Sequence, residues 1–281
     1  MTHRAMQEDI LLSGRRIQGM LQSATNVARL WLVLVLACLS GCGKTTDLAA
    51  GRHAKSVKAL IDLGAEVRDV EDEVTRDRGT YVILFREHFA PDGKVHGDVL
   101  KLIREIQSLF LGVLNSSVSD DAMPDLAVLP NLRVLNATNT RLSDRGVKLI
   151  AASRDLKLLK LNRTRITDDG LECLREMPSL RLLYVGDTDL SVSALPHLAR
   201  LPQLEAIKLS ALPITDAAMQ SLSEMPQLRF LALDGTAVTN TVLKHLDVLP
   251  KLAYLDVQHT AVTHEAITEF RQRHPQCFIK E

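Results

Sequence analysis

A repeat of 24 residues runs through most of this 281-residue chain. Residues 155–178, DLKLLKLNRTRITDDGLECLREMP, give its skeleton, L-x-x-L-x-L-x-x-T-x-I-T-D-x-G-L-x-x-L-x-x-M-P. Well-formed copies occupy 131–154, 179–202, 203–226, 227–250 and 251–274, and a looser copy covers about 107–130. A fixed period of this length predicts a solenoid, in which each repeat is one structural unit stacked on its neighbours.

Each repeat predicts a short strand, a turn, a short helix and a return. Leu159 and Leu161 point to one face of the strand, because side chains alternate along it. A Ser or Thr after the turn is expected to cap the helix: Ser143, Thr167, Ser191, Thr215, Thr239 and Thr263. The acidic residues Asp144, Asp168 and Asp216 follow three of these hydroxyls and favour the positive end of the helix dipole. A closing Pro then ends most of the helices.

This pattern resembles the leucine-rich repeat family, in the variant with T-x-[IL]-[ST]-D-x-G-L in the second half of each repeat. The resemblance covers about residues 107–279. It implies an α/β leucine-rich-repeat solenoid, with parallel strands on the concave face and short helices on the convex face. In place of the family's row of Asn, the chain carries Thr, which we expect to bond the backbone of the adjacent coil: Thr140, Thr164, Thr188, Thr236 and Thr260. Leu212 interrupts this row and Pro213 follows it, so a different turn is expected there.

The N-terminal part contains ten apolar residues, 30–39, directly after Arg29. This run is shorter than the roughly 20 residues that a membrane-spanning helix needs, and it fits the apolar region of a secretory signal. The tetrapeptide LSGC that ends at Cys42 resembles the bacterial lipobox, which implies cleavage before Cys42 and a lipid on that residue. We therefore expect a lipoprotein signal peptide at 1–41, a tether at 42–52, and a lipid-anchored, extracytoplasmic protein of the bacterial cell envelope. Met1 and Met20 are both candidate start residues.

An overlapping stretch supports an alternative function. Ser40 to Thr46, SGCGKTT, is similar to the phosphate-binding loop of nucleotide-binding proteins. That loop requires G-x-x-x-x-G-K-[ST], and here Cys38 stands where the first Gly belongs. No long βαβ pattern follows it. Two further alternatives remain: a signal anchor in which Cys42 is incidental, and a cytoplasmic adaptor similar to the repeat-bearing receptors of ubiquitin ligases.

The segments that flank the repeats are expected to cover the ends of the solenoid. Residues 53–106 predict an N-terminal cap with a degenerate repeat, since helical spacing at 53–63 and 99–106 alternates with strands at 66–70 and 80–85. Residues 71–79 are charged and predict a loop. Seven repeats follow at 107–274. Residues 275–281 are expected to add a C-terminal edge strand.

The predicted strands place three rows of side chains on the concave face. The first row is Val134, Leu158, Leu182, Ala206, Phe230 and Tyr254; the second is Asn136, Lys160, Tyr184, Lys208, Ala232 and Asp256; the third is Thr138, Asn162, Gly186, Ser210, Asp234 and Gln258. The first row is apolar although it should face solvent, and exposed apolar surface often marks an interaction site. The predicted partner-binding residues are Leu158, Lys160, Leu182, Tyr184, Lys208, Phe230 and Tyr254. The alternative is that the first row packs sideways, strand against strand.

Composition and motifs favour a binding module over an enzyme. The formal net charge is +0, so nothing global points to nucleic acid. The sequence contains none of the hydrolase or zinc-protease signatures. Cys173 and Cys277 lie four repeats apart, too far for a disulfide, and the four cysteines lack metal-binding spacing. We expect a monomeric, non-enzymatic protein that binds a protein or peptide, uses no cofactor or metal, and contacts a membrane through its lipid.

Overall fold

The computed structural model describes residues 52–71, 78–201 and 203–281, which all belong to one compact unit, 43–281. The predicted signal peptide, the lipidation site Cys42 and the SGCGKTT stretch lie outside the described residues. The strands are β1 (Glu66–Glu71), β2 (Arg78–Ile83), β3 (Leu109–Gly112), β4 (Leu132–Asn136), β5 (Leu158–Lys160), β6 (Leu182–Tyr184), β7 (Ala206–Lys208), β8 (Phe230–Ala232), β9 (Tyr254–Asp256) and β10 (Phe278–Lys280).

Short helices alternate with these strands. The α-helices are α3 (Arg52–Asp62), α4 (Gly97–Arg104), α5 (Met123–Ala127), α6 (Asp144–Ile150), α7 (Asp168–Leu174), α8 (Leu195–Ala199), α9 (Met219–Ser223), α10 (Thr241–Leu246) and α11 (His264–Arg273). Four 3₁₀ turns are also described: η1 (Arg86–His88), η2 (Asp120–Ala122), η3 (Val192–Ala194) and η4 (Asp216–Ala218).

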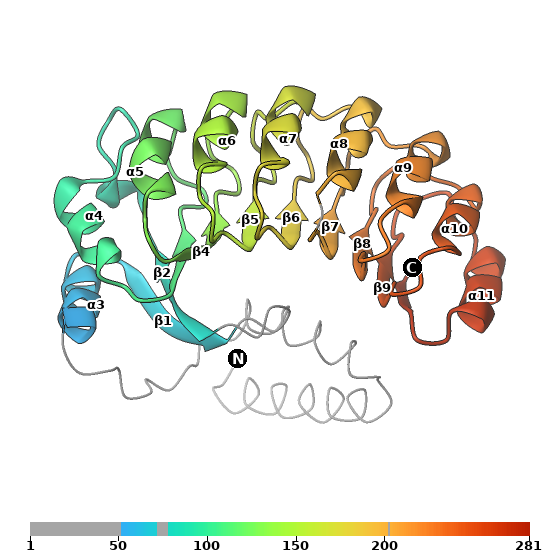
Figure 1. Ribbon diagram of the computed structural model, residues 1–281, viewed down its shortest axis with the longest axis horizontal. Coiled ribbons are helices and arrows are strands. Elements are labelled where there is room, and N and C mark those ends of the chain that lie inside the picture. The colour runs from blue at the N-terminus through green and yellow to red at the C-terminus, as the bar shows by residue number, and fades with distance from the viewer. Residues whose placement is uncertain (1–51, 72–77, 202) are drawn as a thin grey trace, which may run out of the picture. The chain divides into compact units, whose positions relative to one another are not determined.

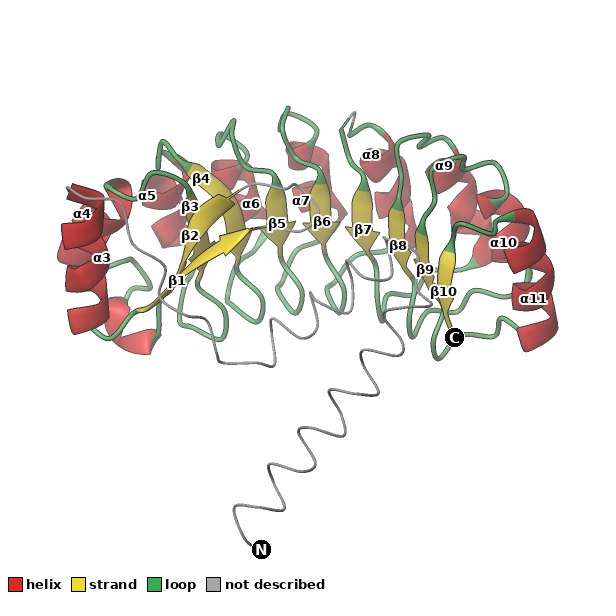
Figure 2. Ribbon diagram, turned by 90° about the horizontal axis from the view of Figure 1, so that it is seen from below, coloured by secondary structure: helices red, strands yellow, loops and turns green. Residues whose placement is uncertain are grey.

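The strands form one open sheet in chain order, from β1 to β10. The strands from β2 onward are parallel, and the registers of β4 to β9 advance by 24 residues from coil to coil, as in the pair Leu158 and Leu182. Figure 1 shows the strands along the concave side and the helices along the convex side, and Figure 2 shows the sheet face-on. This arrangement confirms the predicted α/β repeat solenoid.

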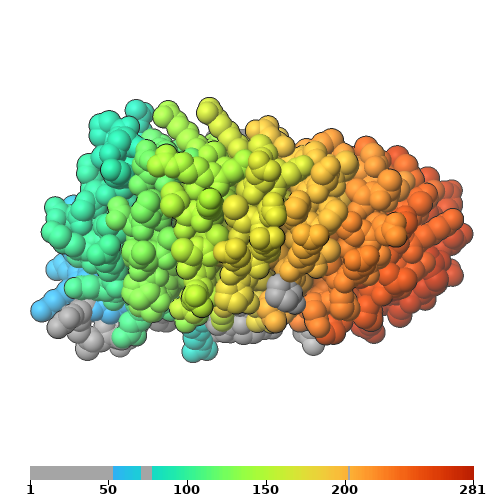
Figure 3. All heavy atoms as spheres, turned by 45° about the horizontal axis from the view of Figure 1, so that its top comes forward, coloured from blue at the N-terminus to red at the C-terminus, as the bar shows by residue number. Residues whose placement is uncertain are grey.

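A leucine core runs the length of the described unit between the sheet and the helices. Leu159 and Leu161 are completely buried, as predicted for the inner face of the strand, and Leu171 and Leu174 meet them from α7. One continuous cluster extends from Val57 to Ile279. The coils lie side by side in chain order, as Figure 3 shows from the helix side.

The two ends of the sheet differ. At the C-terminal end, β10 pairs in parallel with β9 and forms the predicted edge strand. At the N-terminal end, β1 pairs antiparallel with β2. The prediction of a loop over the whole of 71–79 is wrong, because both strands extend into it and pair Glu71 with Arg78. The two strands were predicted at 66–70 and 80–85, whereas their extension into the charged segment and their antiparallel pairing were not.

The turn after each strand contains a residue in the left-handed backbone conformation. These residues recur every 24 positions, with φ from 54° to 70°: Asn115, Asn139, Arg163, Asp187, Ala211, Gly235 and His259. The first six donate their backbone N–H to a carbonyl of the next coil at 2.9–3.1 Å. The turn therefore joins neighbouring coils through the backbone, whatever the side chain.

The Thr row bonds within each repeat. The Thr164 hydroxyl donates to the carbonyl of Leu161 at 2.6 Å, and the other Thr residues of the row do the same at 2.6–2.8 Å. The prediction of bonds to the adjacent coil is wrong, because the tight turn brings a carbonyl three residues back within reach. At Leu212, where the Thr row is broken, the N–H of Ile214 donates to the carbonyl of Leu212 at 2.7 Å, so this turn differs from the others as predicted.

A second set of bonds connects the start of each helix with the next coil. The Asp144 carboxylate accepts hydrogen bonds from the backbone N–H and the hydroxyl of Thr167, at 2.8 and 2.7 Å. Equivalent bonds join Asp120 to Ser143, Asp168 to Ser191, and Asp216 to Thr239. We call these bonds the carboxylate ladder. In the last coil the Asn240 side-chain oxygen accepts from the Thr263 N–H, and its amide nitrogen donates to the Thr263 hydroxyl. A Cβ on Gly170 would overlap the Asp144 carboxylate, which explains the Gly of the T-D-x-G motif.

The predicted Ser and Thr caps lie where expected, but only some of their hydroxyls bond to the start of the helix. Ser143, Thr167, Ser191, Thr215 and Thr263 stand at the N-cap of a helix or 3₁₀ turn, and Thr239 precedes the N-cap residue Asn240. The hydroxyls of Ser191 and Thr263 accept a bond from a helix N–H. The hydroxyls of Ser143 and Thr167 point to the ladder carboxylates instead.

Candidate functional site

The first row of the concave face is buried. Val134, Leu158, Leu182, Ala206, Phe230 and Tyr254 are exposed by only 7%, 5%, 1%, 2%, 8% and 1%. The prediction that this row faces solvent is therefore wrong. Neighbouring strands lie about 4.8 Å apart, and the register places each residue of the row next to its equivalent in the adjacent coil.

Aromatic rings continue this packing to the C-terminal edge. The Phe230 and Tyr254 rings stack with centroids 4.4 Å apart, and the Tyr254 and Phe278 centroids lie 5.7 Å apart. Asp256 is buried beside them, accepting from the Tyr254 hydroxyl at 3.4 Å and pairing with Lys280 at 3.1 Å. Burial first, and then the Asp256 carboxylate, raise the pKa of Tyr254 well above its usual range. Tyr254 is therefore a neutral hydrogen-bond donor at the buried end of the concave face.

The second row contains the half-buried part of the predicted partner-binding site. Lys160, Tyr184 and Lys208 lie on successive strands at one register position. The Lys160 ammonium lies 5.1 Å from the centroid of the Tyr184 ring, which is a cation–π geometry. Further along the row, Ala232 and Asp256 are buried. Over β5 to β7 the second row is thus basic and aromatic.

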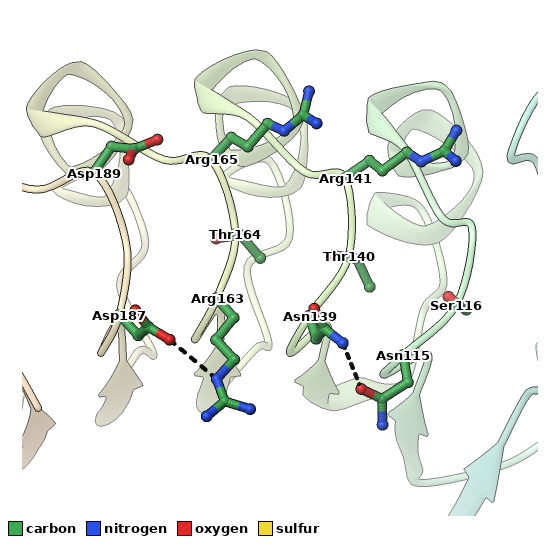
Figure 4. A pocket seen from close by; sticks show the side chains of 10 residues that line it. All are labelled: Asn115, Ser116, Asn139, Thr140, Arg141, Arg163, Thr164, Arg165, Asp187 and Asp189. Carbon is green, nitrogen blue, oxygen red and sulfur yellow. Dashed lines mark hydrogen bonds and ion pairs between the residues drawn. The ribbon is translucent and has the colours of Figure 1, made fainter. Parts of the chain in front are cut away.

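A groove of about 580 Å³ lies at the edge of the solenoid where the strands turn toward the helices. Polar residues line it: Asn115, Ser116, Asn139, Thr140, Arg141, Arg163, Thr164, Arg165, Asp187 and Asp189 (Figure 4). Arg163 pairs with Asp187 at 3.1 Å, and the Asn139 amide donates to the Asn115 side-chain oxygen at 2.8 Å. Sequence reasoning missed this groove, although its arginines and asparagines recur at the 24-residue period.

The cysteines and acidic clusters contribute no further site in the described residues. Cys173 and Cys277 are both free, in agreement with the prediction that they form no disulfide. Burial raises the pKa of the Cys277 thiol to about 12. Within residues 52–71, 78–201 and 203–281, three or more His, Cys, Asp or Glu side chains do not gather as a metal site would require. Across the same residues, every helix is too short or too polar to cross a membrane.

Comparison with known proteins gives no family assignment: no protein-family model matches the chain, and no curated protein matches it significantly.

Proposed function

We propose that this chain is a non-enzymatic protein-interaction module of the leucine-rich-repeat type, which binds a protein or peptide on its concave face. The proposal is supported chiefly by the second row of the sheet. Its residues change in chemistry from coil to coil, from Lys160 to Tyr184 to Lys208, while the leucines behind them stay constant. Such a row supplies recognition without altering the fold.

The concave partner is expected to carry acidic and apolar groups. Lys160 and Lys208 supply positive charge, and Tyr184 supplies a ring of the kind enriched at interfaces. The buried Leu158, Leu182, Phe230 and Tyr254 form the floor beneath the contact, so they support the site without touching much of the partner. We therefore restrict the proposed direct contacts to the second row.

Partner capture tests this proposal directly. Full-length wild-type protein and the Lys160→Ala/Lys208→Ala variant would be crosslinked in envelope extract, and the captured proteins compared by mass spectrometry. The matched control is Lys148→Ala/Lys244→Ala, which removes two exposed lysines from the convex helices α6 and α10. Loss of a specific partner in the concave variant alone is the expected result. Equal capture by all three proteins would contradict the proposal.

We further propose that the module is tethered to a bacterial envelope membrane by a lipid on Cys42. The support is the apolar run at 30–39 followed by the lipobox-like sequence LSGC. Intact mass and labelled palmitate, measured on the membrane fraction, test it against a Cys42→Ser variant. A soluble protein that retains residues 1–41 and binds ATP would favour the nucleotide-binding alternative instead.

A further inference from the structure

Arg141 and Arg165 occupy equivalent positions in adjacent coils, each in the loop between a strand and the following helix. The backbone N–H of Arg141 bonds to Val118 at 3.0 Å, and that of Arg165 bonds to Leu142 at 2.9 Å. These equivalent bonds give the two arginines the same backbone setting in adjacent coils, with Arg165 opposite Ser143. Both side chains are exposed, and Figure 4 shows them extending to the same side, away from Asp189.

Within the described residues, this pair lacks the partners that other charged residues in neighbouring coils have. Asp144 and Asp168, for example, accept hydrogen bonds from Thr167 and Ser191, and Arg163 pairs with the oppositely charged Asp187 at 3.1 Å. In the part of the chain that the structure describes, neither Arg141 nor Arg165 has a carboxylate within ion-pair distance. Two like charges that lie near each other repel. An anion held between the two guanidiniums would remove that repulsion.

The groove beside the two arginines restricts where such an anion can bind. The Thr140 and Thr164 hydroxyls already donate to backbone carbonyls, so they are not the donors for a ligand. Asp187 is neutralised by Arg163. The exposed Asp189 repels anions from its end of the groove, which leaves the end that carries Arg141 and Arg165.

We propose that Arg141 and Arg165 together bind a carboxylate of an acidic peptide segment that lies along this groove. A guanidinium presents a planar fork of N–H donors that matches a carboxylate, so two forks at the coil spacing can hold one carboxylate between them. The polar lining suits an extended peptide whose backbone needs hydrogen-bonding partners. This site is separate from the second row of the concave face and does not depend on it.

The test uses fluorescein-labelled hexaglutamate and the full-length protein, with binding followed by fluorescence anisotropy at low ionic strength. In Arg141→Gln/Arg165→Gln we expect the dissociation constant to rise by about tenfold or more, because two charged donors are lost. The matched control, Arg154→Gln/Arg200→Gln, removes the same charge from exposed positions that follow α6 and α8. It should bind like the wild type. Arg141→Lys/Arg165→Lys keeps the charge without the fork and should bind with intermediate affinity.

Thermal unfolding supplies a second readout. Without peptide, the Arg141→Gln/Arg165→Gln variant should melt no lower than the wild type, and hexaglutamate should raise the melting temperature of the wild type alone. Equal weakening in both double variants, or no binding by the wild type, would overturn the site. If inorganic phosphate displaces the labelled peptide at a lower concentration than glutarate does, the assignment of this site to a carboxylate is overturned. If the protein binds no peptide but cosediments with phosphatidylglycerol vesicles, and if that cosedimentation requires both arginines, the peptide proposal is overturned in favour of a membrane ligand.

Discussion

At the scale of single residues, the carboxylate ladder is interrupted opposite Thr215. The position that holds Asp168 in one coil and Asp216 two coils later is occupied by Val192, which is 43% exposed. Thr215 also stands at an N-cap with no side-chain bond to the turn that follows. Val192 begins the 3₁₀ turn η3, just as the ladder residues Asp120 and Asp216 begin η2 and η4, so the backbone at the interruption matches that of intact positions.

Replacing Val192 with Asp should complete the ladder. The new carboxylate would accept from the N–H and hydroxyl of Thr215, as Asp216 does from Thr239 at 2.9 and 2.5 Å. We expect a gain of about 1 kcal/mol in the free energy of unfolding, because the site is partly exposed. Urea unfolding measures it. Val248→Asp is the matched control, being 63% exposed and outside the ladder, and an equal effect of both changes would contradict the prediction.

The left-handed turn gives a second prediction about a single residue. Ala211 has φ of 55°, whereas Gly235 holds the equivalent place in the next coil at φ of 70°. A Cβ in this conformation costs about 1–2 kcal/mol, and glycine avoids that cost. Glycine also raises the conformational entropy of the unfolded chain, which offsets part of the gain in stability. We expect Ala211→Gly to stabilise the protein by about 0.5 kcal/mol. The control is Ala261→Gly, at an exposed Ala outside the left-handed set, which should destabilise the protein. Thermal melts should therefore show a higher melting temperature for Ala211→Gly and a lower one for Ala261→Gly.

These residues also show where sequence reasoning reached its limit. The buried Leu159 and Leu161 were predictable, because apolar residues in fixed phase have one physical explanation. The left-handed position was not, since Arg163 and Ala211 share no property that marks the turn. The ladder was missed because Asp144 has a sufficient local explanation at its helix start, whereas its partner lies 23 residues away.

At the scale of elements, the stacked rings hold the last three strands together. Tyr254 on β9 is 1% exposed and touches Phe230 on β8 and Phe278 on β10. We expect Tyr254→Ala to cost about 3–5 kcal/mol, because it opens a cavity and leaves Asp256 without one of its donors. Phe278→Ala should cost much less, since this ring is 42% exposed. Equal losses in denaturant unfolding would show that the rings do not act as a buried stack.

The C-terminal edge also contains a probe of local opening. Cys277 is 7% exposed, and burial raises its pKa to about 12, so little thiolate is available near pH 8. In a Cys38→Ser/Cys42→Ser background, a thiol reagent should label the half-buried Cys173 long before Cys277. Rising pH should speed the labelling of Cys277 up to about pH 12. Labelling of Cys277 as fast as of Cys173 would show that the edge strand opens readily.

At the scale of the whole molecule, the concave face was the least predictable feature. One repeat viewed alone places Leu158 and Tyr254 toward solvent, and this is what the sequence predicted. In the folded protein both side chains are buried, and each lies beside its equivalent in the next strand. The period predicted the solenoid, whereas contacts between coils determine which of its surfaces is accessible.

The same reasoning predicts the effect of removing one whole coil. Deleting 179–202 joins repeats in phase, brings Leu158 beside Ala206, and sets Asp168 opposite Thr215, so the ladder interruption disappears. The deletion also brings Lys160 beside Lys208, and the repulsion between these like charges should lower the folding stability slightly. Because a coil contacts chiefly its neighbours, the shortened chain should fold cooperatively, with a urea m-value lower by about a tenth. Deleting 191–202 removes half a coil and shifts the phase, and this control should fail to fold. A 24-residue deletion that disrupts circular dichroism as much as the 12-residue one would show that the coils are not independent units.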